Sequence, residues 1–205
     1  TRAALAEGKV PAPVVSTFGE GAAEALHAVA NLLNRERLRA QALVMIQMSL
    51  HLRAESPPTL YLLGQVFERE EQTEAAMKAY SGIDPATPYG WYARLNVADG
   101  YRIQDNIEKA VRLLRSMIRE RPERPDAARA LGDFLRIDER YREAVAAYDT
   151  AQERLGKNVD WRLYYTRGIA LERAKQWDRA ESDLLKALEL EPDQPLVLNY
   201  LGYSW

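Results

Sequence analysis

The chain of 205 residues contains no cysteine, only two histidines and no long apolar run. Without cysteine it can form neither disulfides nor thiolate metal sites, and it lacks a cysteine nucleophile. The longest apolar candidate, residues 42–50, is interrupted by Gln47 and Ser49. A membrane-spanning helix needs roughly eighteen apolar residues or more. We therefore expect neither a disulfide framework nor a membrane span.

Motifs that carry chemistry are also missing. His27 and His51 do not belong to an HExxH or similar metal-ligand spacing, and the chain has neither a GxSxG nor a GxxxxGK motif. Acidic residues such as Glu68, Glu70 and Glu71 fall at expected helix ends, where solvated charge is usual. The sequence therefore predicts a protein that is not an enzyme and that binds no metal and no cofactor.

The charge balance argues against nucleic acid as a partner. The formal net charge is -2 and 28% of the residues are charged. The arginine-rich stretches, residues 35–39 and 115–124, are mixed with glutamate or interrupted by apolar positions, so they form no basic stripe. Since 47% of the residues are hydrophobic, the chain can bury a core.

Small residues recur at a fixed interval along most of the chain. Gly168 and Gly202 are 34 residues apart, and Ala180 follows Gly168 by twelve residues. The same spacing of twelve appears in each earlier segment, in the pairs Ala30 and Ala42, Gly64 and Ala76, Ala98 and Ala110, and Gly132 and Ala144. Such internal periodicity is typical of repeat proteins.

Within each repeat the apolar residues are spaced as on one face of a helix. Leu60, Leu63 and Phe67 form one such face. A small residue where two helices cross lets their backbones approach closely. This explains why glycine occurs inside a helix here, although it costs about 1 kcal/mol of helix stability relative to alanine. Ser56 before Pro57 and Asp160 before Trp161 are typical helix starts. The pattern predicts pairs of helices, and no alternating strand pattern occurs.

Small residues at the eighth and twentieth repeat positions, with a proline such as Pro192 near the thirty-second, resemble the tetratricopeptide repeat (TPR). The resemblance implies an all-α, right-handed superhelical solenoid of antiparallel helix pairs. Gly156 replaces the usual proline in a fourth unit of 36 residues, and Arg94 occupies a usually apolar position. The expected organisation is an N-terminal, partly extended arm at residues 1–22, five units at residues 23–56, 57–90, 91–124, 125–160 and 161–194, and the first helix of a truncated sixth unit at residues 195–205.

In TPR proteins the first helix of each pair lines a concave groove that holds a peptide or a helix of another protein. Carried over by position, the resemblance nominates His27, Asn31, Asn34, Tyr61, Gln65, Glu68, Tyr92, Asn96, Asp99, Arg102, Arg129, Asp133, Arg136, Arg162, Tyr165, Arg173, Asn199 and Tyr203. Tyrosine and arginine are frequent at binding hot spots. The lysine-and-asparagine clamp for a C-terminal carboxylate is not reproduced, because His27 stands where a lysine is expected.

Two functions remain open at this point. The first is a scaffold or adaptor that binds a partner protein in its groove. The alternative is a self-assembling structural module, a homodimer for example, formed through repeat faces or the uncapped C-terminal end, where Leu198, Leu201 and Trp205 would face a helix that this chain does not contain. The last repeats resemble long TPR proteins of proteobacterial envelopes, which favours the periplasm or cell envelope over the cytoplasm.

Overall fold

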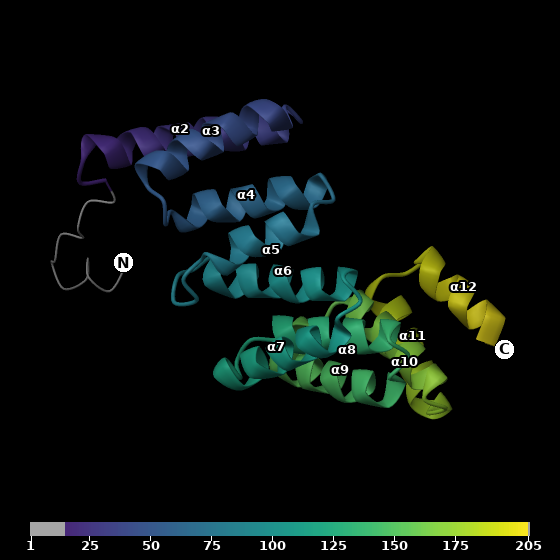
Figure 1. Cartoon of the computed structure of the whole chain (residues 1–205). Helices are drawn as coiled ribbons and strands as arrows, with labels where there is room; N and C mark the ends of the chain where they lie inside the picture. Colours follow the sequence, from purple (N-terminus) through teal and green to yellow (C-terminus); the bar gives the residue numbers. More distant parts are fainter. Residues whose placement is uncertain (1–14, 205) are drawn as a thin grey trace, which may run out of the picture. The chain divides into compact units, whose positions relative to one another are not determined.

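The computed structural model of the protein describes residues 15–204, with side chains to residue 202, and these residues form helices and no strand (Figure 1). The α-helices are α2 (Phe18–Arg35), α3 (Arg39–Leu52), α4 (Pro57–Arg69), α5 (Thr73–Ser81), α6 (Gly90–Ile103), α7 (Ile107–Glu120), α8 (Asp126–Ile137), α9 (Tyr141–Leu155), α10 (Trp161–Arg173), α11 (Trp177–Leu190) and α12 (Pro195–Ser204). A short 3-10 helix, η1 (Gly156–Asn158), follows α9. The expected all-α class is confirmed, and no described helix is long and apolar enough to cross a membrane.

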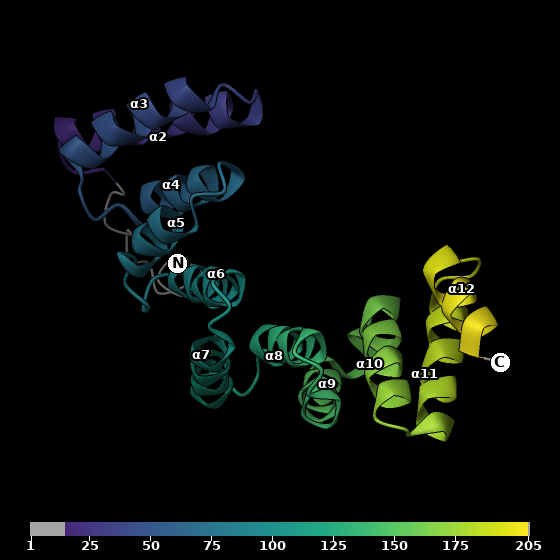
Figure 2. The ribbon, with the colours of Figure 1, turned by 45° about the vertical axis from the view of Figure 1, so that its right-hand side comes forward.

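Consecutive helices pack as hairpins: α2 with α3, α4 with α5, α8 with α9, and α10 with α11 (Figure 2). The chain forms two compact units, one ending at Val97 and the other beginning at Ala98, so that α6 contributes to both. In the first unit α4 packs against α2 and α3, and in the second α10 packs against α8 and α9. Within each unit, one hairpin thus packs on the preceding one, as expected for stacked repeats.

The turn inside each helix pair has one shape throughout. Five residues at equivalent places have positive φ angles between 56° and 63°, namely Arg37, Glu71, Asp105, Glu139 and Lys175. In each turn the next amide donates to a carbonyl five residues back, as from Arg140 N to Leu135 O at 2.8 Å. This is the Schellman arrangement, which satisfies the free carbonyls of a helix end and usually uses glycine at the left-handed position.

Close helix crossings explain the recurring small residues. A Cβ atom placed on Gly132 would lie 2.6 Å from the ring carbons Cδ1 and Cε1 of Tyr148, and Gly64 faces the ring of Tyr80 in the same way. Both tyrosines are at most 2% exposed. The glycines therefore make room for a buried aromatic ring from the second helix of the same pair.

The N-terminal boundary differs from the expected arm. α2 begins at Phe18, so residues 18–22 are helical despite Gly19 and Gly21. The cause is a capped start: Thr17 Oγ1 accepts the Glu20 amide at 3.2 Å, and the Glu20 carboxylate accepts both the amide and the hydroxyl of Ser16. Residues 1–14 of the expected arm lie outside the described residues.

Candidate functional site

In the first unit, side chains of successive first helices contact one another. The ring Nδ1 of His27 on α2 lies 3.4 Å from the hydroxyl of Thr59 on α4. The amide of Asn96 on α6 donates to the hydroxyl of Tyr61 on α4 at 3.3 Å. These contacts join positions 32 and 35 residues apart in the chain. We call the surface formed by these side chains of successive first helices the first-helix face.

Aromatic rings and amides dominate this face in the first unit. The ring of Tyr61 lies 5.4 Å from the ring of Tyr80 and 5.6 Å from that of Tyr89, measured between centroids. The half-buried residues nominated from the sequence are His27, Asn31, Tyr61, Gln65 and Asn96, while Glu68 and Tyr92 are exposed. Side chains of this kind offer hydrogen bonds and flat apolar area without a strong net charge.

The hydroxyl of Tyr80 is buried beneath this face and makes no direct hydrogen bond within the described residues. Burial raises the pKa of Tyr80, and the nearby Glu68 carboxylate raises it further, whereas Asn96 acts in the opposite direction. Tyr80 is not among the residues nominated from the sequence. Its hydroxyl is a buried polar group close to the nominated residues Glu68 and Asn96.

A hollow of about 230 Å³ opens beside His27, lined by Ala23, Glu24, His27, Arg53, Ser56, Pro58 and Tyr89. Burial lowers the pKa of His27, although Glu24 opposes this shift. His27 is therefore a neutral hydrogen-bonding group at neutral pH, not the cation that a lysine would supply. The hydroxyl of Ser56 contacts Thr59 at 2.9 Å, so it does not cap α4 as expected from the sequence.

In the second unit two of the nominated arginines, Arg102 and Arg129, are paired with carboxylates. Arg129 donates to Asp160 at 3.0 Å, and Arg102 donates to Asp99 at 2.7 Å. The guanidinium of Arg102 also lies 5.6 Å from the ring centroid of Phe134. Because each of these two arginines is neutralised by a neighbouring carboxylate, this part of the face offers a ligand ion pairs and not unpaired charges.

Asp133 is held inside a small network. Tyr148 donates its hydroxyl to Asp133 at 2.7 Å, and Arg136 donates to the Tyr148 oxygen at 3.3 Å. Burial raises the pKa of Asp133, against the opposing effects of Tyr148, Arg136 and Arg129. Tyr148 occupies the position that Tyr80 has in the first unit, but its hydroxyl is fully bonded.

Near the C-terminal end of the second unit three aromatic rings lie in series. The ring of Tyr165 is 6.2 Å from Trp161 and 6.1 Å from Tyr200, and Tyr200 meets it edge-on. Arg162 lies 4.7 Å from the Trp161 ring centroid. The sequence prediction missed Tyr200, although its distance of 35 residues from Tyr165 equals the distance between Tyr61 and Asn96.

Four nominated residues lie apart from these clusters. Asn34 is 3% exposed, because its side-chain oxygen accepts from Arg69 at 3.0 Å. Arg173 lines a hollow at the hairpin turns together with Glu139 and Arg140. Asn199 is exposed on α12, and the side chain of Tyr203 lies outside the described residues. The structure thus groups most of the nominated residues into two first-helix faces, one in each unit.

Two family models match the chain. Residues 98–159 and residues 161–194 each match a model described as the tetratricopeptide repeat. Two curated relatives are the general transcriptional corepressor ssn6 of Schizosaccharomyces pombe, 24% identical over 143 residues, and the TPR repeat-containing protein PA4667 of Pseudomonas aeruginosa, 26% identical over 146 residues. These alignments include 70% and 69% of this chain but only 13% and 24% of the relatives.

Solved structures share the fold at low sequence identity. PilW, a type IV pilus biogenesis factor, has a TM-score of 0.75 at 15% identity, with 87% of this chain and 82% of PilW covered. MamA of Desulfovibrio magneticus RS-1 has a TM-score of 0.71 at 16% identity, with 88% and 99% covered. YrrB, a TPR protein, has a TM-score of 0.65 at 18% identity, with 86% and 90% covered. Stacked helix pairs, small residues at each crossing and two matched repeat models together establish that this chain is a tetratricopeptide repeat protein.

Proposed function

We propose that the protein binds an extended peptide or a helix of another protein on its first-helix faces. One observation carries this proposal: in each unit, tyrosine rings lie together on the first-helix face. These are Tyr61 with Tyr89 in the first unit and Tyr165 with Tyr200 in the second. Tyr89 is exposed and the other three are half-buried. Accessible tyrosine gives large contact area and a polar tip at low entropic cost, which suits a binding hot spot.

The polar residues around these rings fit a peptide backbone better than a strongly charged ligand. Asn31, Gln65 and Asn96 can donate to a carbonyl and accept from an amide. Arg129 and Arg102 are already paired, which leaves Arg162 as an exposed cation on the second face. YrrB, which shares the fold, is described as having an unusual peptide-binding site, and this supports the same class of ligand here.

Binding can be measured with peptides of about twelve residues selected from a random library on the wild-type protein. Tyr165→Ala in the second unit and Tyr61→Ala in the first should each weaken a selected peptide by about tenfold or more, the effect of removing a hot-spot side chain. Arg142→Ala, an exposed change on the second helix α9, is the matched control and should leave affinity unchanged. Circular dichroism should show that each variant is folded. Equal affinity of all variants would refute a role for the first-helix faces.

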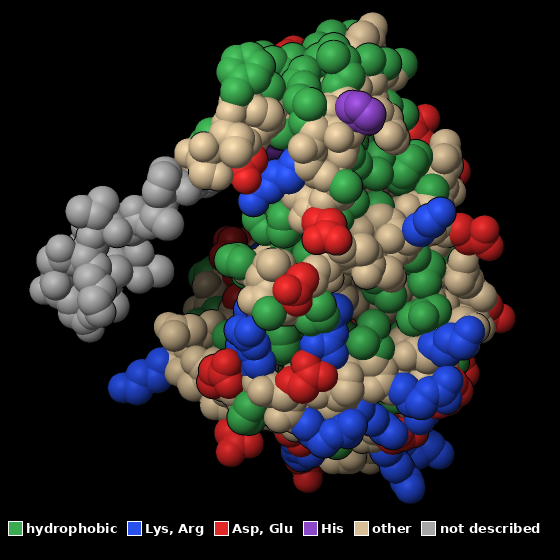
Figure 3. All heavy atoms as spheres, turned by 60° about the vertical axis from the view of Figure 1, so that its left-hand side comes forward, with side chains coloured by type: hydrophobic (Ala, Val, Ile, Leu, Met, Phe, Trp, Pro, Cys, Tyr) green, Lys and Arg blue, Asp and Glu red, His purple; other side chains and the backbone are tan. Residues whose placement is uncertain are grey.

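Self-assembly is a second candidate, favoured by an exposed apolar surface on the first hairpin. At the seventh and tenth repeat positions, Leu131 and Phe134 of α8 are 6% and 7% exposed. Their counterparts on α2, Val29 and Leu32, are 46% and 59% exposed. Figure 3 shows apolar side chains gathered over this hairpin. We propose a second copy of the chain as the occupant, since the surface continues the interface by which hairpins stack.

The oligomeric state tests this candidate. Light scattering across a concentration range should show a rise in mass for the wild type and no rise for Leu32→Glu, which places a charge in the apolar surface. Glu24→Gln, on the same helix but outside that surface, should behave as the wild type. A wild type that stays monomeric throughout would rule the second candidate out.

A further inference from the structure

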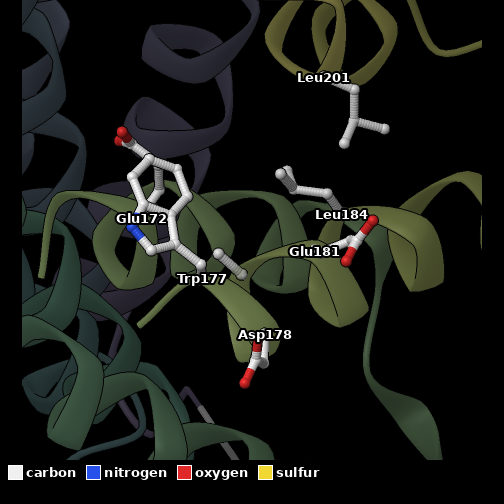
Figure 4. Close-up of a pocket in the computed structure, with 7 residues that line it drawn as sticks. Glu172, Trp177, Asp178, Glu181, Leu184 and Leu201 are labelled. Atoms are coloured by element: carbon white, nitrogen blue, oxygen red, sulfur yellow. The ribbon is translucent and has the colours of Figure 1, made fainter. Parts of the chain in front are cut away.

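A hollow of about 280 Å³ lies between α10, α11 and α12 of the second unit, and it borders the first-helix face where Glu172 accepts from Tyr200. It is lined by Glu172, Trp177, Asp178, Ala180, Glu181, Leu184 and Leu201. Figure 4 shows the indole of Trp177 and the side chains of Leu184 and Leu201 bordering one space, with the Glu181 carboxylate beside Leu184. Trp177 is 53% exposed, whereas Leu184 is 2% exposed and forms the floor.

The repeat frame shows what is unusual about this hollow. At the twenty-first repeat position, on the second helix, the first four units carry Leu43, Met77, Val111 and Val145. Val111 and Val145 are 1% and 4% exposed. The fifth unit carries Glu181 instead, and Glu181 is exposed. A position that packs against apolar neighbours elsewhere is therefore acidic here.

The charge of the hollow is of one sign. Among the described residues that line it, Glu172, Asp178 and Glu181 are acidic and none is basic, while Arg173, outside the lining, lies 3.5 Å from the Glu172 carboxylate. Tyr200 donates to the Glu172 carboxylate at 2.8 Å, which fixes that group in place. Asp178 and Glu181 form no ion pair with any other described residue. An apolar floor with an exposed indole and uncompensated carboxylates is complementary to a cation on an apolar stem.

We propose that this hollow binds an arginine side chain of a partner protein, presented next to an apolar residue. The planar guanidinium stacks on the Trp177 ring and pairs with the Glu181 carboxylate, while the neighbouring apolar side chain covers Leu184 and Leu201. Arginine fits better than lysine because it stacks and forms two parallel hydrogen bonds at once. The chain itself contains the same stacking, with Arg162 lying 4.7 Å from the ring centroid of Trp161. This site does not depend on peptide binding by the first-helix faces.

The test is a titration with the blocked dipeptide N-acetyl-leucyl-arginine amide, followed through the indole N–H signal of Trp177 by NMR. The signal is assigned by its loss in Trp177→Phe. We expect a saturable shift that weakens as ionic strength rises, because the ion pair is partly exposed. Glu181→Gln should weaken the dipeptide by about threefold or more, the size expected for one exposed charge pair with stacking.

Two controls separate this site from general electrostatics. Glu153→Gln removes one negative charge from α9, outside the hollow, and should leave the affinity of the dipeptide unchanged. N-acetyl-leucyl-glutamate amide should produce no saturable shift in the wild type. Absence of a saturable shift with the arginine dipeptide, an equal shift with the glutamate dipeptide, or an unchanged affinity in Glu181→Gln would each overturn the proposal.

Discussion

The carboxylate of Asp183 accepts two hydrogen bonds from the guanidinium of Arg167, at 2.7 Å from Nε and 2.8 Å from Nη2, and both residues are 6% exposed. Arg167 also donates to Asp149 at 2.8 Å and contacts Gln152. One buried side chain of α10 therefore connects α9 with α11. A buried, fully bonded pair of this kind fixes how helices fit together, because any shift leaves a charge unpaired.

Arg167→Leu should lower the free energy of unfolding of the second unit by about 3–5 kcal/mol, since it leaves Asp183 buried without its partner. Urea unfolding followed by circular dichroism measures this change. Arg179→Ala is the control, because Arg179 pairs with the same Asp149 but its side chain is 49% exposed. That variant should cost no more than about 1 kcal/mol. Equal losses in the two variants would contradict the structural role of the buried pair.

Gly132→Ala should destabilise the second unit although alanine favours helices. The added Cβ would lie 2.6 Å from the Tyr148 ring, and overpacking of this kind typically costs about 1–3 kcal/mol. Gly202→Ala on α12 is the matched change, because a Cβ there meets nothing within 4 Å. It should be neutral or stabilise by up to about 1 kcal/mol. Thermal unfolding of both variants measures whether each substitution lowers or raises the stability.

Tyr80 and Tyr148 should respond in opposite ways to loss of the hydroxyl. Tyr148→Phe breaks the hydrogen bond to Asp133 and should cost about 1.5–3 kcal/mol, the range for bonds to charged groups. Tyr80→Phe removes a buried hydroxyl that has no direct partner in the described residues, so it should be neutral or stabilising. Chemical unfolding of each variant provides the measurement. A large loss in Tyr80→Phe would mean that its hydroxyl is bonded after all.

Two aspartates of the second unit should give stability changes of opposite sign with pH. Burial raises the pKa of Asp133, so the folded state holds its proton more tightly, and this contribution to stability is lost as pH rises through the raised pKa. Burial also acts to raise the pKa of Asp160, but the hydrogen bonds from Arg129 and from the Leu163 amide outweigh it and lower the pKa. The contribution of Asp160 is therefore lost as pH falls.

Difference measurements separate these two effects from all other titrating groups. The free energy of unfolding of the wild type minus that of Asp133→Asn should rise when the pH is lowered from about 7 to about 4. The same difference for Asp160→Asn should fall when the pH is lowered further, from about 5 to about 2, because the lowered pKa of Asp160 places its loss of charge there. Asparagine can still cap α10 but cannot form the ion pair with Arg129. Parallel slopes for the two variants would be inconsistent with the structure.

The helix pairs could be predicted from the sequence because the constraint is local and repeated. Gly64 and Gly132 are small because each faces a tyrosine ring from the second helix, and Gly168 faces Leu184 at the equivalent place of its pair. The conformation of the turns was not predicted, since residues such as Glu139 and Lys175 adopt a left-handed conformation that glycine usually marks. The helical start at Phe18 was missed because it depends on two side chains, Ser16 and Glu20, bonding across one turn.

The candidate site was predictable by position but not by environment. The frame placed Asn34 and Tyr61 alike on first helices, yet Arg69 from the next pair covers Asn34 and leaves Tyr61 half-exposed. In the same way, the pairing of Arg129 with Asp160 depends on the turn after α9, where the repeat is longer than usual. Contacts between successive helix pairs decide which nominated side chains stay accessible to a ligand. The sequence pattern of a single pair does not contain information about these contacts.

Amide chemical-shift mapping with a selected peptide tests peptide binding most directly. Peptide bound as proposed should perturb signals of first helices, foremost around Tyr61 on α4 and Tyr165 on α10, and should leave the outward-facing residues of α9 and α11 unchanged. Perturbation confined to those second helices, or no saturable perturbation with any selected peptide, would contradict the account.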